Sequence, residues 1–485
     1  MEQPTPRPVP DYPGPVTDEN IRAIFAGAGD FYARELRCGN VTLYVYMIDG
    51  LVSGGDASEY ILKPISQDLK GDSPQALYEA ALAGEIYNSV ADPCEDLDTV
   101  ARKLVNGFGV VLFPGAGALA FEIKTGEKRS PGPPEVEATV KGPKDAFTET
   151  VRTNTSLLRR HLRTPDLRLH ETVVGRRSLT NVTVAYIEGL TDPELVERMK
   201  ARLDEIDIDG FLSPAAVEEY VTGSRKTAFP LMQYTERTDK FAQGLLAGRV
   251  GLLVDGLPLG YLAPADLGYL MTSPEDRGTD YLSASFLRIL RYLTLGLTLI
   301  LPGLYAAMAA FHQEMIPLPL LRAIIESKEN VPFPTAVEVL GLLLSFELLQ
   351  EAGIHLPQPI GQTVSIIGGI VVGTAAVEAK LVSPAALIVV AAAGICGFAL
   401  PSRDFSEAVR LWRLALALMG SLWGLFGVTF GFLALLVHLA ELRCLGVSYL
   451  APLAELRRRN LLRGRLVTSK ERDPRLHPWD SRNQR

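Results

Sequence analysis

Cysteine is scarce in this chain of 485 residues, and the spacing of the few cysteines indicates no pairing. The four, Cys38, Cys94, Cys396 and Cys444, form no CxxC motif. The sequence therefore predicts no disulfide framework, which suits a reducing compartment for the soluble part of the chain. The first 15 residues, MEQPTPRPVPDYPGP, lack an apolar run. We expect no secretory signal peptide there, and we expect residues 1–15 to be extended and mobile.

Motifs of the common enzyme classes are also missing. The sequence contains no HExxH and no GxSxG. The glycine-rich stretch 114–117 lies between two expected strands rather than before a helix, which excludes a dinucleotide fingerprint or a P-loop. The six histidines are scattered along the chain. We therefore predict a protein that is not an enzyme, with no metal site and no cofactor.

Charged and apolar residues are distributed unevenly along the chain. Residues 1–280 carry charges throughout, whereas nearly all long apolar runs lie between 283 and 442. From Glu455 to Arg485, ten Arg or Lys face four Asp or Glu. Basic clusters beside membrane helices face the cytoplasm and attract anionic headgroups, so the tail indicates a cytoplasmic C-terminus. A tail that is only solvated is the alternative.

The soluble half contains two stretches with one pattern. In each, apolar residues alternate on both sides of a turn, and a helix, a strand, a turn and another strand follow. MIDGLVS (47–53) corresponds to YIEGLTD (186–192), and KLVNGFGVVLFPGAGALAF (103–121) corresponds to GLLAGRVGLLVDGLPLGYL (244–262). We therefore predict two related α/β subdomains; chance similarity between generic helix–strand units is the alternative.

Between the two copies, GPKDAFTETVRTNTSLLRRHLR (142–163) has apolar residues at roughly helical spacing and a basic end. We expect an amphipathic helix that packs the two subdomains together and exposes an arginine face to solvent. A nucleic-acid partner would require a larger basic surface and aromatic residues for stacking, so none is predicted.

The first apolar run of the second half extends from Leu290 to Phe311, long enough to cross about 30 Å of hydrocarbon. Arg288 and Arg291 precede it and place that end in the cytoplasm. Pro302 is expected to kink the helix. The next segment, 313–334, is too short and mixed to span, so we expect it at the interface on the far side of the membrane.

Later apolar segments bring the expected number of spans to about four to six. We predict helices over 338–351, 361–378 and 384–400, and a charged cytoplasmic segment over 402–413. The last run, 411–442, is either one overlong helix or a hairpin broken near Gly424–Gly431. A single span would place the basic tail outside, so its charge favours the hairpin or an equivalent compensating re-entry of the chain.

Polar residues inside these apolar segments are the candidate functional residues. A carboxylate in hydrocarbon costs about 2.5–3.5 kcal/mol on insertion scales, so it normally faces a bundle interior or a water-filled path. Small residues let helices approach closely. A buried core of a large soluble protein, with carboxylates at helix ends, is the alternative. The candidates for a pore or bundle interior are Glu338, Glu347, Glu351, Gln362 and Glu378, and those for close packing are Gly368, Gly369 and Gly373.

Ordered motifs along almost the whole chain resemble one known family. The longest is PFPTAVEVLGLLLSFELLQEAGIHLPQPIGQTVSIIGGIVVGTAAVEAKLVSPA (332–385). NTSLLRRHLR, YTERTDKFAQGLLAGRVGLLVDGLPLGYLAP, EMIPLPLL, VPFP, SRDFSEAVR and LGVSYLAPL occur as well. They are similar to motifs of the A subunits of GerA-type spore germination proteins, from about residue 30 to 465. One departure is Lys380, where the family often has glycine.

The resemblance implies a multi-pass protein of the endospore inner membrane with a cytoplasmic N-terminal region. It implies a transporter-like B subunit that senses nutrients and a lipoprotein C subunit as partners. It also implies assembly of A subunits, as a pentamer, into a ligand-gated channel that releases monovalent cations. A paralogue of the SpoVAF type forms a signal-amplifying ion channel, and the motifs do not separate the two.

The expected fold is α/β in the soluble region and α-helical in the membrane. A channel is the leading hypothesis, because rings of acidic side chains line cation pores. A transporter-like sensor would require repeated halves with broken helices, which the sequence after 283 does not show, and a scaffold would not require intramembrane carboxylates. The expected parts are a Pro-rich 1–15, subdomains 16–135 and 136–280, a membrane domain 283–445 and a basic tail 446–485.

Overall fold

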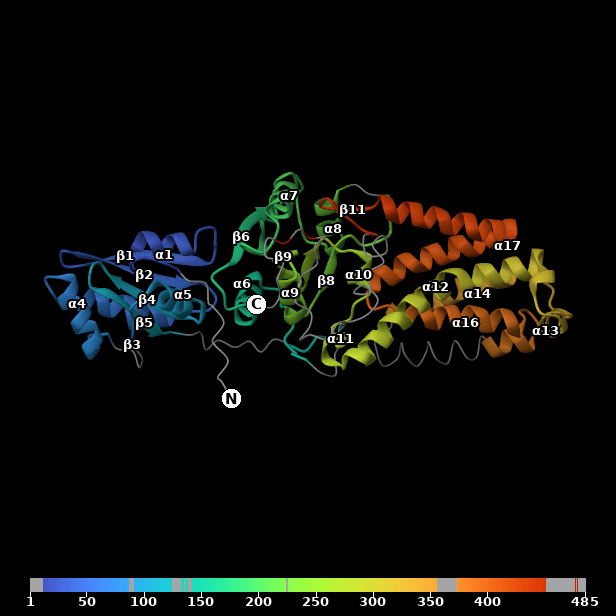
Figure 1. Ribbon diagram of the computed structural model, residues 1–485, viewed down its shortest axis with the longest axis horizontal. Coiled ribbons are helices and arrows are strands. Elements are labelled where there is room, and N and C mark those ends of the chain that lie inside the picture. The colour runs from blue at the N-terminus through green and yellow to red at the C-terminus, as the bar shows by residue number, and fades with distance from the viewer. Residues whose placement is uncertain are drawn as a thin grey trace. The chain divides into compact units, whose positions relative to one another are not determined.

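The structure is a computed structural model that describes residues 12–86, 91–123, 132–134, 137, 142–223, 226–355, 373–450, 476 and 478 (Figure 1). The chain divides into two compact units. The first, called the soluble unit here, comprises 1–225, 232–264 and 466–485. The second, called the helical unit, comprises 226–231 and 265–465. The limits expected from the sequence for the Pro-rich segment, the two subdomains, the membrane domain and the basic tail stay predictions.

The soluble unit begins with a five-stranded sheet in the order β1-β2-β4-β5-β3, in which all neighbours are antiparallel. The first predicted turn is Gly39-Asn40, which joins β1 to β2 where Cys38 pairs with Val41. The elements are α1 (Asp18–Ile24), β1 (Phe31–Cys38), β2 (Val41–Ile48), α2 (Gly54–Ala57), η1 (Ser58–Leu62), α3 (Lys63–Gln67), α4 (Pro74–Ala80), η2 (Ala81–Glu85), β3 (Ala91–Cys94), α5 (Leu97–Val105), β4 (Phe108–Phe113) and β5 (Gly117–Glu122).

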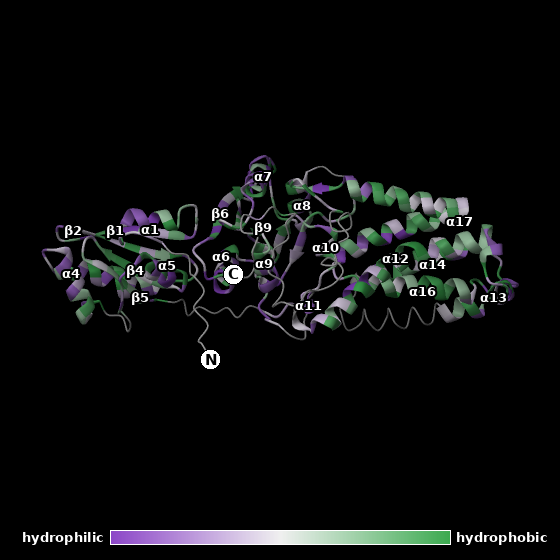
Figure 2. Ribbon diagram, viewed as in Figure 1, coloured by the Kyte–Doolittle hydropathy of each residue, from purple (hydrophilic) through white to green (hydrophobic). Residues whose placement is uncertain are grey.

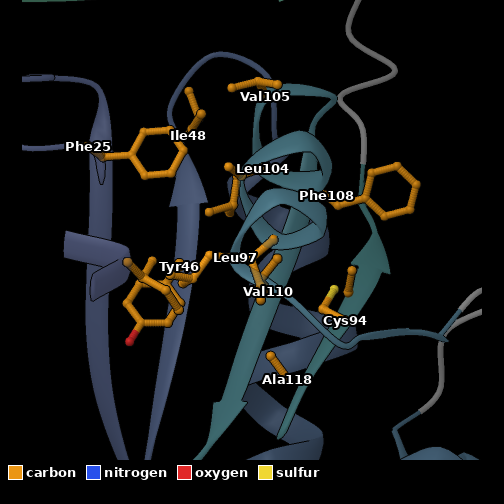
Figure 3. Close-up of a cluster of buried hydrophobic side chains, with 14 of the residues drawn as sticks. Phe25, Tyr46, Ile48, Cys94, Leu97, Leu104, Val105, Phe108, Val110 and Ala118 are labelled. Carbon is orange, nitrogen blue, oxygen red and sulfur yellow. The ribbon is translucent and has the colours of Figure 1, made fainter. Parts of the chain in front are cut away.

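Both faces of this sheet are buried. Successive residues of a strand point to opposite faces, and on β4 they belong to two different hydrophobic cores. On β4, Val110 belongs to a core that includes Phe25, which directly follows α1, and Leu104 of α5 (Figure 3). The next residue, Val111, belongs to a second core with Ile61 of η1. The continuous apolar run of β4 follows from this burial on both sides.

A second five-stranded antiparallel sheet has the order β6-β7-β9-β10-β8. The two orders agree when β1 to β5 are matched with β6 to β10, so the repeated pattern of the sequence has a structural counterpart. Because neighbouring strands are antiparallel, each subdomain is α+β in the strict sense. The elements are β6 (Leu167–Val174), β7 (Thr180–Ile187), α7 (Pro193–Asp204), α8 (Pro214–Thr222), β8 (Gln233–Thr235), α9 (Thr238–Leu246), β9 (Val250–Val254) and β10 (Gly260–Ala263).

The helix predicted over 142–163 is shorter than expected, since α6 covers only Val151–His161. Asn154 holds the preceding stretch in a turn, because it accepts from Thr148 N at 2.7 Å and donates to Thr148 O at 2.6 Å. Further upstream, Phe147 N donates to Glu236 O at 2.7 Å, which makes that stretch extended.

As predicted, α6 packs against both subdomains, but its basic face is not wholly solvated. Arg159 is fully buried, and Nε and Nη2 each lie 2.8 Å from an oxygen of Asp30. Ser156 Oγ donates to Gly50 O at 2.7 Å. The expectation of a solvated arginine face is therefore wrong at Arg159, because this guanidinium joins the two subdomains.

The helical unit is built from long helices that are mainly apolar (Figure 2). Within the described ranges, two of them, α12 and α17, are long and apolar enough to cross a membrane, and α16 is a shorter apolar helix. The elements are α10 (Leu267–Leu270), α11 (Glu275–Gly278), α12 (Tyr281–Phe311), η3 (Gln313–Met315), α13 (Leu318–Lys328), α14 (Thr335–His355), α16 (Pro384–Phe398), α17 (Arg403–Glu441), β11 (Arg443–Cys444) and β12 (Val447–Ser448), with a further helical stretch over 373–378.

α17 is a hairpin of two helical limbs rather than one straight helix (Figure 1). Gly424 has φ +63° and ψ −146°, a conformation that only glycine adopts readily. A Cβ on Gly427 would lie 2.1 Å from Met419 O, although eight residues of straight helix span about 12 Å. The hairpin predicted near Gly424–Gly431 is therefore confirmed.

The two ends of the helical unit follow from these contacts. We call the end where α12 begins the near end and the end where it finishes, at Phe311, the far end. The hairpin turn lies at the far end, since a Cβ on Gly424 would be 3.0 Å from His312 Nε2. Midway, a Cβ on Gly303 would be 2.8 Å from Leu416 O. The first limb of α17 therefore runs alongside α12, and the second limb returns the chain to the near end.

Parts of the predicted terminal segments fall outside the described residues. This holds for residues 1–11 of the Pro-rich segment and for most of the basic tail. Tyr12 N donates to Asp98 Oδ1 at 2.9 Å, and the Tyr12 hydroxyl donates to Asp166 Oδ1 at 3.3 Å. At Tyr12 the chain is thus hydrogen-bonded to both subdomains.

Candidate functional site

α14 carries three of the five polar candidates, and its geometry separates two of them. Glu338 lies in its first turn, and Glu347 follows nine residues later. Nine residues of helix span about 14 Å, so the two carboxylates serve different clusters. Each cluster joins α14 to other helices of the same unit.

The first cluster surrounds Glu338, which is 2% exposed. Its Oε2 accepts from Ser383 N at 3.0 Å and from Ser383 Oγ at 2.7 Å, and its Oε1 lies 3.0 Å from Lys328 Nζ. Ser383 is the N-cap of α16 and also accepts from Ala386 N at 3.3 Å. The carboxylate therefore faces the positive end of a helix dipole and an ammonium group, which together compensate its burial.

The second cluster surrounds Glu347 and contains two arginines of the first limb of α17. Arg410 Nε lies 3.2 Å from Glu347 Oε2, and Arg410 Nη1 donates to Gln350 Oε1 at 2.6 Å. Arg413 is 1% exposed and donates to Glu347 Oε1. Its guanidinium carbon lies 5.9 Å from the ring centre of Phe346. One carboxylate thus lies between two guanidinium groups, which leaves a local excess of positive charge.

Arg413 is a residue that the sequence reading missed. The segment 402–413 was expected to be a charged cytoplasmic segment, whereas the structure places the Arg413 side chain inside the helical unit. A usable signal exists in the sequence, because Arg413 directly precedes the apolar run LALALMG. A cation beside such a run requires an anion from another helix.

The remaining candidates are not brought together in the described residues. Glu351 and Glu378 are both exposed. Gly373 packs against α16, where a Cβ would lie 3.7 Å from a methyl group of Leu387. Gln362, Gly368 and Gly369 lie outside the described residues.

The backbone conformation of Lys380 explains why the family often has glycine at this position. Its φ is +56°, in the left-handed region that glycine adopts without strain. The side chain is exposed. A glycine at this position would adopt the turn before α16 without strain. Lys380 adopts the same turn with a strained backbone conformation.

A third charged cluster lies where α12 begins. Asp276 is 1% exposed and accepts from Arg288 Nε at 3.0 Å and from Arg291 Nη1 and Nη2 at 2.9 and 2.8 Å. Burial alone would raise the pKa of Asp276, but the hydrogen bonds from Arg291 and Arg288 outweigh it and hold the pKa below its usual range. The two arginines expected to mark the cytoplasmic end of the first span are thus partly neutralised.

In each of these clusters, carboxylates and basic side chains compensate each other's charge. Within the described residues, no three or more metal-ligating side chains gather at one point. The clusters connect helices of this unit through ion pairs between side chains.

Comparisons with known proteins agree on one family. A family model described as "Bacillus/Clostridium GerA spore germination protein" matches residues 19–474. The chain is 34% identical to "Uncharacterized membrane protein YfkQ" of Bacillus subtilis (strain 168) over 91% of this chain and 86% of that protein. It is 36% identical to spore germination protein KA of the same organism over 88% of this chain and 79% of that protein. For spore germination protein A1 the identity is 36%, over 75% of each.

One solved structure is also similar. It is the crystal structure of the N-terminal domain of the A subunit of the Bacillus megaterium spore germinant receptor GerK3. The identity is 26%, with a TM-score of 0.39, over 50% of this chain and 92% of that chain.

Proposed function

The chain belongs to the GerA family of spore germination proteins, and from this premise we propose that it is the A subunit of a nutrient-responsive germinant receptor. In this proposal, copies of the chain assemble, as a pentamer, into a ligand-gated channel in the spore inner membrane. The channel releases monovalent cations when a germinant binds to the receptor. A transporter-like B subunit and a lipoprotein C subunit complete the complex, and the chain itself has no catalytic step.

The observation that supports a channel is the combination of exposed carboxylates with an apolar outer surface. Glu351 lies one turn beyond Glu347, which pairs with Arg410 near the start of α17, at the near end. Glu378 precedes α16, whose N-cap Ser383 contacts Glu338 at the opposite end of α14. A carboxylate that faced lipid would be costly, whereas one that faces water between identical chains is not. Large exposed apolar side chains on the same unit include Leu344, Leu348, Ile388, Ile395, Leu418, Leu422, Phe426, Phe430, Leu433 and Val437.

The proposed path therefore has an acidic residue near each mouth. Five copies would bring five carboxylates together at each mouth, which attracts cations and excludes anions. Glu338 and Glu347 have a different role in this proposal, because Glu338 is buried, Glu347 is half-buried, and both carboxylates join helices of the same unit. They hold α14 against α16 and α17 and set the position of the path lining.

The orientation in the membrane follows from charge. We propose that the near end faces the cytoplasm, because Arg288 and Arg291 lie there and the basic tail begins there. The highly charged soluble unit then remains on the cytoplasmic side. The multi-pass arrangement of about four to six spans is part of the same proposal.

The test is cation flux through the purified protein in liposomes, with the partner subunits and a germinant present. Glu351→Gln and Glu378→Gln should each lower the cation current and its selectivity over anions, while the oligomeric state is unchanged. Glu197→Gln is the matched control, since Glu197 is an exposed carboxylate of the soluble unit. Germinant uptake without current would favour a transporter, and neither uptake nor current would favour a scaffold.

A further inference from the structure

Six residues of the second subdomain belong to the helical unit. The chain leaves the soluble unit after residue 225 and returns to it at 232. In sequence, this segment, Lys226–Leu231, connects α8 to β8, which lies at the edge of the second sheet beside β10. We call it the clasp segment.

The centre of the clasp segment is Phe229, which is 1% exposed. Its ring lies 5.9 Å from that of Phe405 at the start of α17, 6.3 Å from that of His438 near the end of α17 and 6.1 Å from that of Tyr449. These partners belong to both limbs of the hairpin and to the stretch that follows it. A single side chain therefore fills the space between the near ends of the two limbs.

Hydrogen bonds fix the clasp segment around this ring. Thr227 Oγ1 lies 2.8 Å from His438 Nε2, and Phe229 N donates to Thr227 Oγ1 at 3.1 Å. The ring of His438 in turn lies 5.7 Å from that of Trp412 in the first limb. At the other end of the segment, Ala265 N donates to Leu231 O at 2.8 Å.

We propose that the clasp segment transmits the state of the second soluble subdomain to the near ends of the α17 hairpin. Six residues reach at most about 20 Å when extended, so the segment is a short link between the two units. Packed interiors shift between discrete arrangements rather than deform continuously. In this proposal, a change at α8 or β8 therefore reaches Phe229 through the chain and shifts it within its pocket. Because Phe229 contacts both limbs, its displacement changes their separation.

The inference can be tested by the fluorescence of single tryptophans in the full chain in lipid nanodiscs. One form retains Trp412 beside His438, with Trp423→Phe and Trp479→Phe. The reference form retains Trp423 at the hairpin turn, with Trp412→Phe and Trp479→Phe. Val221→Ala, a buried truncation in α8, should change acrylamide quenching of Trp412 but not of Trp423. Val111→Ala, an equally buried truncation in the first sheet, should change neither.

A double-mutant cycle separates transmission from a general loosening of the protein. In the presence of Phe229→Ala, Val221→Ala should no longer affect Trp412, because the connection is already broken. If the effects of the two substitutions add, or if Val221→Ala leaves Trp412 unchanged, the proposal is wrong. Thr227→Val replaces Phe229→Ala in the cycle if the latter protein does not fold, since it removes the hydroxyl group at similar volume.

A second readout rests on the proposed function. Germinant-evoked cation release should fall about tenfold in Phe229→Ala, as expected for a residue on a coupling route, with unchanged abundance. Leu212→Ala, at an exposed apolar residue of the same subdomain, is the control and should release cations normally. Absence of any current in the unmodified protein would overturn the proposed function, whereas the tryptophan cycle would still decide the role of the clasp segment.

Discussion

Three buried arginines show how single residues of this chain are accommodated. Arg159, Arg237 and Arg413 are each at most 1% exposed, and each has a carboxylate partner. A guanidinium group presents its N–H donors in a planar fork that suits a carboxylate. The charge of each buried guanidinium group therefore has a carboxylate beside it, although Arg413 shares Glu347 with Arg410. The loss of one partner would leave an uncompensated charge in a buried site.

Arg159→Met should destabilise the soluble unit by about 3–5 kcal/mol, because Asp30 would remain buried without its partner. Hydrogen exchange of α6 and β6 in the full chain measures this loss. Arg176→Met is the control, since Arg176 pairs with Asp207 at 2.5 Å while both side chains are at least 65% exposed. An exposed pair contributes about 0–1 kcal/mol, so equal effects of the two substitutions would contradict this account.

The sequence predicts such residues only in part. It identifies Glu338 and Glu347 as costly, because both lie in apolar runs. It does not identify their partners, since Lys328 precedes α14 and Arg413 follows Glu347 by 66 residues. Pairing over such separations depends on which helices become neighbours. Local periodicity carries no information on that point.

At the scale of elements, strands and turns were predicted well, and helix limits were predicted less well. The alternation of β2 and the turn before it follow from local residues. The start of α6 does not follow from local residues. The stretch before it, around Phe147, is extended and hydrogen-bonded to Glu236, and this pairing between distant residues replaces the first turns of the predicted helix. The break in α17 was predictable because glycines cluster around the turn, and Gly424 and Gly427 are both required by the backbone.

Gly427→Ala should destabilise the helical unit by about 1–3 kcal/mol, because the new methyl group would overlap Met419 O and force the limbs apart. Gly296→Ala provides a control of opposite sign. Nothing lies within 4 Å of a Cβ at Gly296, which is inside α12, so alanine should stabilise that helix by about 0.5–1 kcal/mol. Thermal unfolding in detergent measures both. A Gly427→Ala protein as stable as the unmodified one would contradict the hairpin.

At the scale of the whole molecule, the hairpin decides where the chain leaves the helical unit. α12 begins at the near end, and the second limb of α17 returns there, where His438 contacts the clasp segment. Both the entry before Tyr281 and the exit after Leu442 therefore lie at one end, whatever path residues 356–372 take. The positive charge of the basic tail also favours a hairpin that returns the chain to the end where α12 begins. The geometry of α17 and the charge of the tail are separate observations that lead to the same arrangement.

This agreement predicts the sidedness of labelling in membrane vesicles. In a chain whose four cysteines are replaced by serine, Thr279→Cys and Ser448→Cys should react with a membrane-impermeant maleimide from the same side. Glu314→Cys should react from the opposite side, because η3 follows the far end of α12 and its Glu314 side chain is 74% exposed. Labelling of Ser448→Cys together with Glu314→Cys would mean that α17 crosses the membrane as one span. That outcome would separate His438 from Trp412, which the hairpin places 5.7 Å apart, and the transmission proposal would be lost with it.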